Sequence, residues 1–464
     1  MSVVSRGQTM ATAPRAARSP TGAPGAAISA DRPPPTVQRA QSAVPRAMRR
    51  YLSLDDFAPA ARRRLPKMLH GFVSGGVETD ASLRDNRQAF AEYGFVPRVL
   101  NDVSGRNQTT TLFGKTYAAP FGIPPFGSAA LCAYRGDIVL TRAAAAMNVP
   151  MILSAASLIS LEEVRRANPN TWYQAYLAGD AARIEPLVDR VAAAGYDTFV
   201  VTADVPVSAN RENNIRNGFQ VPLVITPQVA FDAAVHPRWL LGTWMRTLTS
   251  HGMPHFENMD ATRGPPVLSQ NLMRNIGNRD QLAWKHVELI RRRWTGKLVV
   301  KGILAPQDAR IARECGVDGV MVSNHGGRQL DGAISPLRTL AEIAADANGM
   351  TVMLDGGIRR GTDVLKALAL GAQSASSAGR CSMRRWSPAR RACAARSSCC
   401  ARRSIATWRC SGRAASPRSR RIWCDGSAPG TTARSGRTKH ETGSGGSIFF
   451  TATRDTGRPR PRAQ

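Results

Sequence analysis

The chain has 464 residues and a formal net charge of +30, which by itself would suggest a polyanionic partner such as nucleic acid. The charge is concentrated at the ends, because residues 1–50 carry a net +7, residues 375–464 a net +17 and residues 51–374 only +6. Polyanion binding would therefore have to come from the basic tail, and the middle of the chain has the charge balance of an ordinary enzyme.

The first 50 residues are rich in Ala, Pro and Arg, and they lack the apolar run of a secretory signal peptide. We expect a disordered basic extension here. No stretch approaches the roughly 20 apolar residues that a membrane-spanning helix needs. Cys132 and Cys315 are the only cysteines before residue 380, which favours a reducing compartment and a cytoplasmic protein.

Residues 51–374 alternate short apolar runs with amphipathic stretches, as repeated βα units do. The predicted strands are Ala118–Pro124, Met151–Ala156, Trp172–Leu177, Thr198–Asp204, Leu298–Ile303, Gly319–Asn324 and Thr351–Gly356. The predicted helices are Gly136–Asn148, Ser160–Ala167, Ala181–Ala194, Asp280–Trp294, Pro306–Cys315, Pro336–Asp346 and Gly361–Leu370. The pattern indicates seven consecutive βα units.

Polar side chains follow the ends of these strands, namely Ser154, Gln174, Tyr176, Thr202, Asp204, Lys301, Ser323, His325 and Asp355. In a (β/α)8 TIM barrel such ends meet at one mouth, whereas an open doubly wound sheet would spread them along a line. The pattern therefore predicts an α/β barrel. Its eighth strand should begin just after Ala372, where the composition changes, so we expect the barrel to be incomplete at the eighth βα unit.

From Ala375 to Gln464 the chain has no Leu and no Val, and it has 19 Arg but only one Lys. Burial of aliphatic side chains is the main term that offsets backbone entropy, so we expect residues 375–464 to be disordered. The profile is typical of a GC-rich coding sequence read out of frame, and we hypothesise a frame shift near Ala375. The six tail cysteines lack the paired CxxC spacing of zinc sites, so no metal site is expected.

The run SNHGGRQLD, from Ser323 to Asp331, places an imidazole and a guanidinium three residues apart on a glycine-flanked loop. His325 can take a proton there while Arg328 holds a carboxylate, although a lone histidine is more often a structural polar residue. The run DGGIR, from Asp355 to Arg359, lies between a strand and a helix. Its N–H groups and Arg359 can hold a phosphate, or its glycines serve only a tight turn.

Two further cations follow strands. Lys301 ends an apolar strand, a place where a lysine seldom lies without a partner, and a negative cofactor atom would supply one. Arg211, after the fourth strand, is as typical of a surface residue as of a ligand.

Together these motifs resemble the FMN-dependent α-hydroxy acid dehydrogenase and oxidase family, which includes L-lactate dehydrogenase, glycolate oxidase and mandelate dehydrogenase. The resemblance covers Tyr51 to Gly371. It is carried, in order, by LPKM (65–68), FVPRVL (95–100), QAY (174–176), TAD (202–204), VKG (300–302), SNHGGRQLD and DGGIR. It implies oxidation of a small L-2-hydroxy acid to the 2-keto acid with FMN as cofactor.

The resemblance also implies roles for the matching residues. His325 is the expected base, Asp204 would stabilise its imidazolium form, and Tyr176 would hydrogen-bond the substrate oxygen. Arg211 and Arg328 are expected to hold the substrate carboxylate. The residues expected to contact FMN are Pro125, Gly127, Ser154, Gln174, Thr202, Lys301, Ser323, Asp355, Gly356, Gly357 and Arg359. Among them, Asp355 would bind the ribityl hydroxyls, and Gly357 and Arg359 would hold the phosphate.

Two positions depart from the family pattern. The tyrosine that follows LPKM in the family is Phe72 here, which cannot donate a hydrogen bond and favours a bulkier or more apolar substrate. The family's Gly-Arg pair after the eighth strand is out of register at Gly379-Arg380, so we assign it no role. Without a complete eighth unit we also expect an open barrel edge beside the phosphate site and weak FMN retention.

The insertion Phe219–Gln270 contains Trp239 and Trp244 in an amphipathic segment and resembles that of membrane-associated, quinone-reducing members. It either lies on the inner face of the plasma membrane or covers the barrel mouth. The electron acceptor stays open between quinone, cytochrome and oxygen, as does a homo-oligomer. Two other functions stay open as well: a non-redox barrel for a phosphorylated ligand, and polyanion binding by the tail.

Overall fold

The computed structural model describes residues 50–97, 99–101, 107–270, 278–377, 410–414 and 421–424, so the expectations for residues 1–49 and for Gly379-Arg380 lie outside the described residues. Its centre is a sheet of eight strands in the order β4-β11-β10-β9-β8-β7-β6-β5. These strands are β4 (Phe121–Gly122), β5 (Met151–Ser154), β6 (Thr171–Ala175), β7 (Thr198–Thr202), β8 (Lys297–Ile303), β9 (Gly319–Val322), β10 (Thr351–Asp355) and β11 (Ser374–Ser376). All neighbouring pairs are parallel, which confirms the predicted barrel class.

The sequence predicted an open barrel edge at the eighth strand, whereas the eighth strand, β11, is paired on both of its edges. It pairs with β10 on one side and with β4 on the other. The thinnest junction lies between β4 and β5, where one parallel bridge joins Ile123 to Met151. Ladder hydrogen bonds come from the backbone, so the small residues of β11 are sufficient to continue the sheet. The barrel is nearly closed, with its seam away from the strand that the sequence left in doubt.

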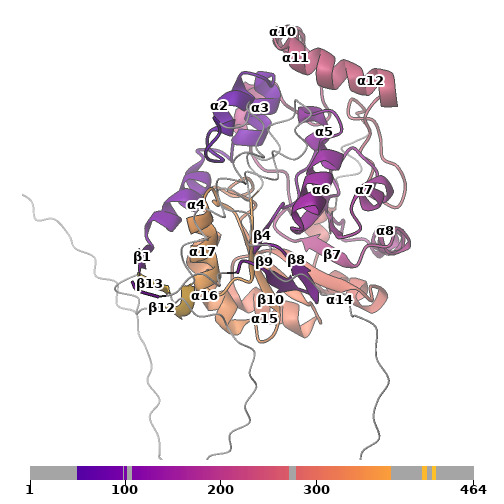
Figure 1. The fold of residues 1–464 in the computed structure, drawn as a ribbon. Coiled ribbons are helices and arrows are strands. Elements are labelled where there is room, and N and C mark those ends of the chain that lie inside the picture. The colour runs from indigo at the N-terminus through magenta and orange to yellow at the C-terminus, as the bar shows by residue number, and fades with distance from the viewer. Residues whose placement is uncertain are drawn as a thin grey trace, which may run out of the picture.

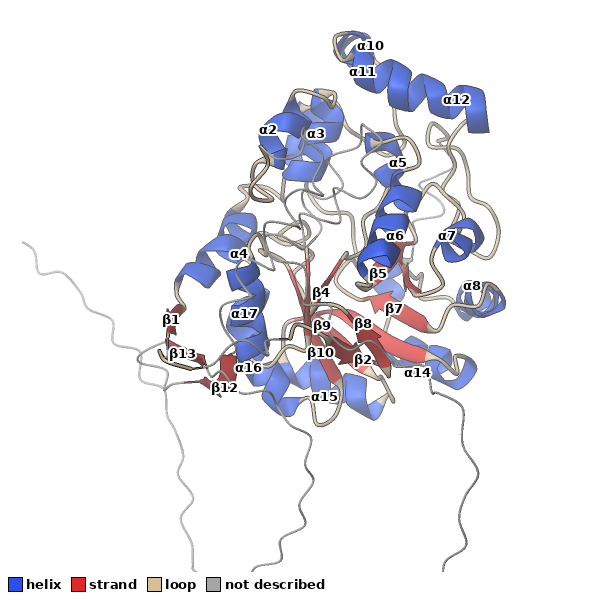
Figure 2. Cartoon of the chain, viewed as in Figure 1, coloured by secondary structure: helices blue, strands red, loops and turns tan. Residues whose placement is uncertain are grey.

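Helices follow the strands and pack around the outside of the barrel, as Figure 2 shows for α14 to α17. They are α5 (Ala129–Cys132), α6 (Gly136–Met147), α7 (Leu161–Ala167), α8 (Ala181–Ala193), α14 (Trp284–Arg293), α15 (Pro306–Glu314), α16 (Pro336–Asp346) and α17 (Gly361–Ala369). Local signals set their starts, because the Ser160 and Asp180 side chains accept hydrogen bonds from backbone N–H groups of α7 and α8. Proline opens α15 and α16, where its missing N–H costs nothing.

The barrel interior is filled at its N-terminal end. Inward-facing side chains of six strands form a buried cluster with the hairpin β2 (Thr110–Leu112) and β3 (Lys115–Tyr117), which closes this end. The cluster consists of Leu112, Tyr117, Ile152, Trp172, Val200, Val299, Met321 and Met353. Because this end is packed with apolar side chains, only the opposite end of the barrel is available for a polar site.

Additional elements lie at the barrel mouth and at one side. Helices α2 (Phe57–Arg62), α3 (Lys67–Ser74) and α4 (Ala81–Ala91) precede the barrel, and α9 (Glu212–Arg216), α10 (Pro227–Ala234), α11 (Pro237–Trp239), the π-helical η2 (Leu240–Met245) and α12 (Arg246–His251) belong to the long loop after β7. In Figure 1, α10 to α12 form a rod at one extreme of the molecule. Strands β12 (Cys410–Ala414) and β13 (Arg421–Cys424) form a small sheet with β1 (Gly94–Val96). The rest of the chain after residue 377 lies outside the described residues, so the proposed domain boundaries and tail stay predictions.

Candidate active site

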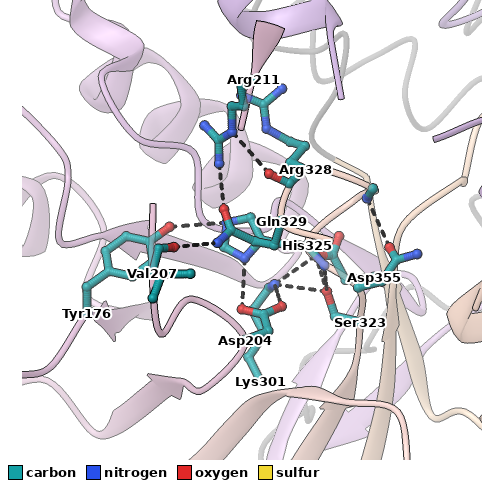
Figure 3. A network of polar contacts seen from close by, with 12 residues as sticks. Tyr176, Asp204, Val207, Arg211, Lys301, Ser323, His325, Arg328, Gln329 and Asp355 are labelled. Carbon is teal, nitrogen blue, oxygen red and sulfur yellow. Dashed lines mark hydrogen bonds and ion pairs between the residues drawn. The ribbon is translucent and has the colours of Figure 1, made fainter. Parts of the chain in front are cut away.

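A ring of polar side chains lies directly above the apolar plug. Ser154, Gln174, Thr202, Lys301, Ser323 and Asp355 each follow an inward-facing plug residue by two positions. Successive side chains of a strand alternate between its faces, so residues two apart share the inner face. The predicted strand-end residues are therefore brought together at one mouth, and Figure 3 shows several of them in one polar network.

A cavity of about 570 Å³ opens above this ring. Of the predicted site residues, those in its wall are Pro125, Gly127, Tyr176, Thr202, Arg211, Lys301, His325, Arg328, Asp355, Gly356, Gly357 and Arg359. Ser154, Gln174, Asp204 and Ser323 lie behind that wall, where they are buried and contact or support its members. The structure thus gathers every predicted residue in or next to one cavity.

His325 has the geometry of an oriented base. Its Nδ1 lies 2.8 Å from Oδ1 of Asp204, and its Nε2 lies 3.4 Å from the Tyr176 hydroxyl. Burial lowers the pKa of His325, Lys301 lowers it further, and Asp204 opposes them. The imidazole is therefore neutral near pH 7, with Nδ1–H donating to the carboxylate and Nε2 free to accept a proton. The phenol pKa of Tyr176 is raised by burial, so this hydroxyl remains a donor.

Lys301 lies at the centre of the polar ring. Its Nζ donates to Oγ of Ser323 at 2.9 Å and lies 3.3 Å from Asp355 and 3.6 Å from Asp204. Burial acts to lower the pKa of Lys301, but the two carboxylates more than offset it and the pKa is raised. The same ammonium and His325 hold the pKa of Asp204 low despite the burial of that carboxyl. A buried cation at the mouth is thus kept charged by its neighbours.

Two guanidinium groups cover the mouth beside His325 (Figure 3). Arg211 donates from Nε to the backbone carbonyl of Arg328 at 3.0 Å and from Nη2 to Gln329 at 2.8 Å. Arg328 donates to the backbone carbonyls of Gly75 and Phe72 at 2.5 and 2.7 Å. Burial and the neighbouring Arg211 lower the pKa of Arg328 to about 9, which leaves it charged at neutral pH. Neither arginine has a carboxylate partner among the described residues, so an anion would find two cations here.

The DGGIR loop has the backbone that its glycines predict. Gly356 and Gly357 have φ values of +113° and +78°, and a Cβ on Gly357 would lie 2.0 Å from the carbonyl oxygen of Asn86. The backbone N–H groups of Arg359 and Arg360 donate to Asp363 at the start of α17, each at 2.8 Å. Only glycine fits these two positions, and the loop with Arg359 faces the cavity.

The description "FMN-dependent dehydrogenase" belongs to the family whose sequence model matches residues 61–384. The chain belongs to this family. It is 36% identical over 323 residues to (S)-mandelate dehydrogenase of Pseudomonas putida, covering 69% of this chain and 80% of that protein. It is 40% identical over 324 residues to L-lactate dehydrogenase of Xanthomonas euvesicatoria, covering 69% of this chain and 82% of that protein.

Solved structures of the family have the same fold. The crystal structure of a monotopic membrane protein, (S)-mandelate dehydrogenase, has a TM-score of 0.69 at 32% identity and covers 77% of this chain and 95% of that one. A mandelate oxidase structure has a TM-score of 0.62 at 31% identity and covers 76% and 93%. The protein is an FMN-dependent α-hydroxy acid oxidoreductase by family.

The cavity fits FMN in its donor set. Both amide atoms of Gln174 and the hydroxyl of Thr202 are buried without a hydrogen-bond partner among the described residues, a costly arrangement unless a ligand completes it. A Cβ on Gly127 would lie 2.9 Å from the Ala156 side chain, so a glycine is needed there. At this position the cavity wall is formed by the backbone of the chain. A flat polar ring system would form hydrogen bonds with Gln174 and Thr202 and would pack against the backbone at Gly127.

Three residues of the site have no motif that predicts them. Asn86 of α4 forms two amide hydrogen bonds with Asn324, both of 2.8 Å, and so holds the His325 loop. Phe219 stacks on Phe72 with ring centres 4.3 Å apart. Arg279 lies over the Tyr176 ring, 4.9 Å from its centre. Each is brought in by tertiary contact from a segment without a recognisable pattern.

Proposed function

We propose that the protein oxidises a small L-2-hydroxy acid to the 2-keto acid, with His325 as the base. The observation that carries this proposal is the buried His325–Asp204 pair, 2.8 Å long, at a cavity that also presents Arg211 and Arg328. A neutral imidazole can take a proton from the substrate, and the carboxylate then stabilises the imidazolium. A positioned base of this kind contributes roughly 10²–10⁴-fold to rate.

The arginines orient the substrate in this proposal. Arg211 and Arg328 bind the C1 carboxylate, which places the neighbouring C–OH group beside Nε2 of His325. Tyr176 donates its hydroxyl hydrogen bond to the substrate oxygen. His325 removes the proton and Asp204 keeps Nδ1 as the donor, so the tautomer of the base is fixed before substrate binds.

A bound FMN would supply the acceptor for the hydride equivalent and the route for its electrons to a second acceptor. Gln174, Thr202 and Lys301 would hold its ring, while the Gly356-Gly357 loop and Arg359 would hold its phosphate. Pro125, Gly127, Ser154, Ser323 and Asp355 complete the proposed cofactor contacts. The charged Lys301 ammonium at this place would stabilise negative charge on a bound, reduced ring.

The substrate side of the cavity supports an acid bulkier than lactate. Phe72 and Phe219 form a stacked aromatic pair in its wall, and the Arg328 guanidinium lies 5.4 Å from the centre of the Phe72 ring. Because Phe72 has no hydroxyl, carboxylate binding depends on the two arginines alone. Relatives named for lactate and for mandelate both match the chain, so both acids are substrates to compare.

The test is reduction of the purified, FMN-loaded protein. Anaerobic mixing with (S)-lactate or (S)-mandelate should bleach the oxidised flavin absorbance, and His325→Gln should retain flavin yet bleach at least about 10²-fold more slowly. Absence of bleaching by any L-2-hydroxy acid, in a protein that binds FMN, would refute the proposal. Retention of a phosphorylated metabolite instead of FMN would favour the non-redox alternative.

We also propose peripheral membrane association through the α10–α12 rod. Its apolar side chains Phe231, Val235, Leu241 and Met245 are exposed, while Trp239 is buried and donates to the carbonyl of Leu131 at 2.8 Å. No helix in the described part of the chain is long and apolar enough to cross a bilayer. One face of the rod thus packs on the protein and the other presents apolar surface, which suits an interface.

Vesicle sedimentation tests this association. The wild type should pellet with anionic lipid vesicles, and the double variant Phe231→Ser/Leu241→Ser should not, because its insertion area is reduced. Equal pelleting of both proteins would contradict the proposal. A quinone as electron acceptor would be consistent with membrane binding, while cytochrome and oxygen stay alternatives to be separated by assay.

A further inference from the structure

Arg279 is a cation in the wall of the active-site cavity that neither the base nor the cofactor site uses. It begins the short 3-10 turn η3 (Arg279–Gln281), and its guanidinium carbon lies 4.9 Å from the centre of the Tyr176 ring. A guanidinium that stacks on an aromatic face keeps the N–H donors along its edge for other partners.

Each of the other cationic side chains in the cavity wall either lies near a carboxylate of the protein or has been proposed to bind an anionic group of the substrate or cofactor. Lys301 lies between Asp204 and Asp355, and Arg87 is 3.6 Å from Asp55. The three remaining arginines are those proposed above for the substrate carboxylate and the cofactor phosphate. Among the described residues of the cavity wall, Arg279 is therefore the cation that remains without an assigned anionic partner.

Asp260, the carboxylate whose charge acts to raise the pKa of Arg279, is already bound to another arginine. Arg183 donates to it from Nε at 3.1 Å and from Nη2 to both oxygens at 2.8 and 2.9 Å. The Arg279 guanidinium has no hydrogen bond or ion pair within the described residues, and its contact there is with the Tyr176 ring. Burial lowers the pKa of Arg279, as expected for a partly desolvated cation without a close carboxylate.

Tyr176 connects Arg279 to the reacting centre. Its hydroxyl lies 3.4 Å from Nε2 of His325, and its ring face contacts Arg279, so one phenol separates the base from the guanidinium. Tyr176 and Asp355, which precedes the proposed phosphate loop, lie on opposite sides of the polar network in Figure 3. A substrate group that reached Arg279 would lie on the Tyr176 side of the base.

We propose that Arg279 binds a second anionic group of the substrate, so that the preferred substrate is a short 2-hydroxy dicarboxylic acid. This inference rests on the proposed function. The C1 carboxylate lies on Arg211 and Arg328, and the distal carboxylate lies on Arg279. Phe256 and Met259, which line the same cavity, provide apolar surface for the methylene groups between the two ends. Arg279 is a specificity-determining residue, not a participant in proton transfer.

The test compares two keto acids of equal length. 2-Oxoglutarate and 2-oxopentanoate differ only in a distal carboxylate against a methyl group, and their affinities for the FMN-loaded enzyme are measured by titration calorimetry, which needs no turnover. The wild type should bind 2-oxoglutarate at least about tenfold more tightly, the usual effect of a charge-assisted hydrogen bond. Arg279→Gln should remove this preference and leave the 2-oxopentanoate affinity unchanged.

Two further variants make the result specific. Arg279→Lys should retain part of the preference, because it keeps the charge without the planar fork. Arg310→Gln, which removes an exposed arginine paired with Asp346, should retain all of it. In steady-state kinetics, Arg279→Gln should raise KM for (S)-2-hydroxyglutarate and leave KM and kcat for (S)-2-hydroxypentanoate unchanged.

The outcomes separate this inference from the function on which it rests. Equal wild-type affinities for the two keto acids, or a preference that survives in Arg279→Gln, overturn the dicarboxylate inference and leave the hydroxy acid oxidation in place. The wild-type comparison decides alone if that variant does not fold. Failure to bind either acid also overturns the dicarboxylate inference alone, whereas absence of flavin reduction by any hydroxy acid overturns the proposed function.

Discussion

Replacing Asp204 by Asn tests the assignment of the base most directly. The Asp204 carboxylate accepts a hydrogen bond from Nδ1 of His325 at 2.8 Å, and both side chains are largely buried, with 11% and 17% exposed. Two unit charges about 4 Å apart at an effective dielectric of about 20 interact by about 4 kcal/mol, an upper bound here. A hydrogen bond to a charged group contributes about 1.5–3 kcal/mol net.

The expected loss in kcat/KM for Asp204→Asn is therefore about 10²-fold. The pH dependence gives a sharper result. Asp204 is the neighbour that raises the pKa of His325, against burial and Lys301, which lower it. Without the carboxylate the pKa of His325 falls further, so the acidic limb of the kcat/KM profile, where the base becomes protonated, should move to lower pH.

The assay is the pH profile of kcat/KM for the wild type and the variant with the same hydroxy acid. Asp318→Asn is the matched control, because Asp318 pairs with Arg291 and Lys297 next to the first residue of β9, away from the mouth. It should change stability without moving the acidic limb. An acidic limb that stays in place or moves to higher pH in Asp204→Asn, or a rate loss below about threefold, would refute the role of this pair.

Three further changes have defined outcomes. Gly357→Ala should abolish FMN retention while the barrel still forms, because its Cβ would meet the Asn86 carbonyl; a flavin-to-protein ratio equal to that of the wild type would contradict this. Phe72→Tyr should lower KM for the hydroxy acid by about two- to tenfold through a new donor to the carboxylate, and an unchanged or higher KM would count against that placement. Burial raises the pKa of Asp137 to about 6, so the folded protein binds this proton more tightly than the unfolded chain, and stability should fall by up to about 3 kcal/mol as pH rises from about 4 to 6. Urea titrations of Asp137→Asn should show a flatter pH dependence over this window, and an equal slope in both proteins would disprove the assignment.

The sequence predicted the barrel and the strand-end residues because both follow from local periodicity. In the strand Thr351–Asp355, the residues from Val352 to Leu354 are apolar and buried and the strand ends on an inward carboxylate, so pattern and structure agree. The predicted helix Asp280–Trp294 shows the limit, since the structure has a 3-10 turn first and begins the helix only at Trp284. Leu282 and Ala283 between them are extended, which no periodicity encodes.

Contacts between distant segments could not be predicted in this way. Leu112 and Tyr117 close the barrel floor from a hairpin whose sequence has no motif, and Phe219 meets Phe72 from a long insertion. Arg279 follows an insertion that has no repeat or motif, and its place over Tyr176 is set by packing alone. The candidate site was thus predictable where a side chain follows a strand or belongs to a motif, and not where packing alone brings in a residue from a segment without a pattern.

The amide pair between Asn86 and Asn324 has a consequence for how the active site is acquired during folding. It joins residues 238 positions apart, and beside it the N-terminal segment donates from Ser82 N–H to Asp331 at 2.9 Å. The loop so held carries three successive left-handed residues, His325, Gly326 and Gly327, a conformation that needs outside support. These hydrogen bonds join α4 to the His325 loop and are not part of the strand ladders, so the strands can pair without them. A chain whose barrel has closed but whose helix α4 has not docked would have native secondary structure and no competent base.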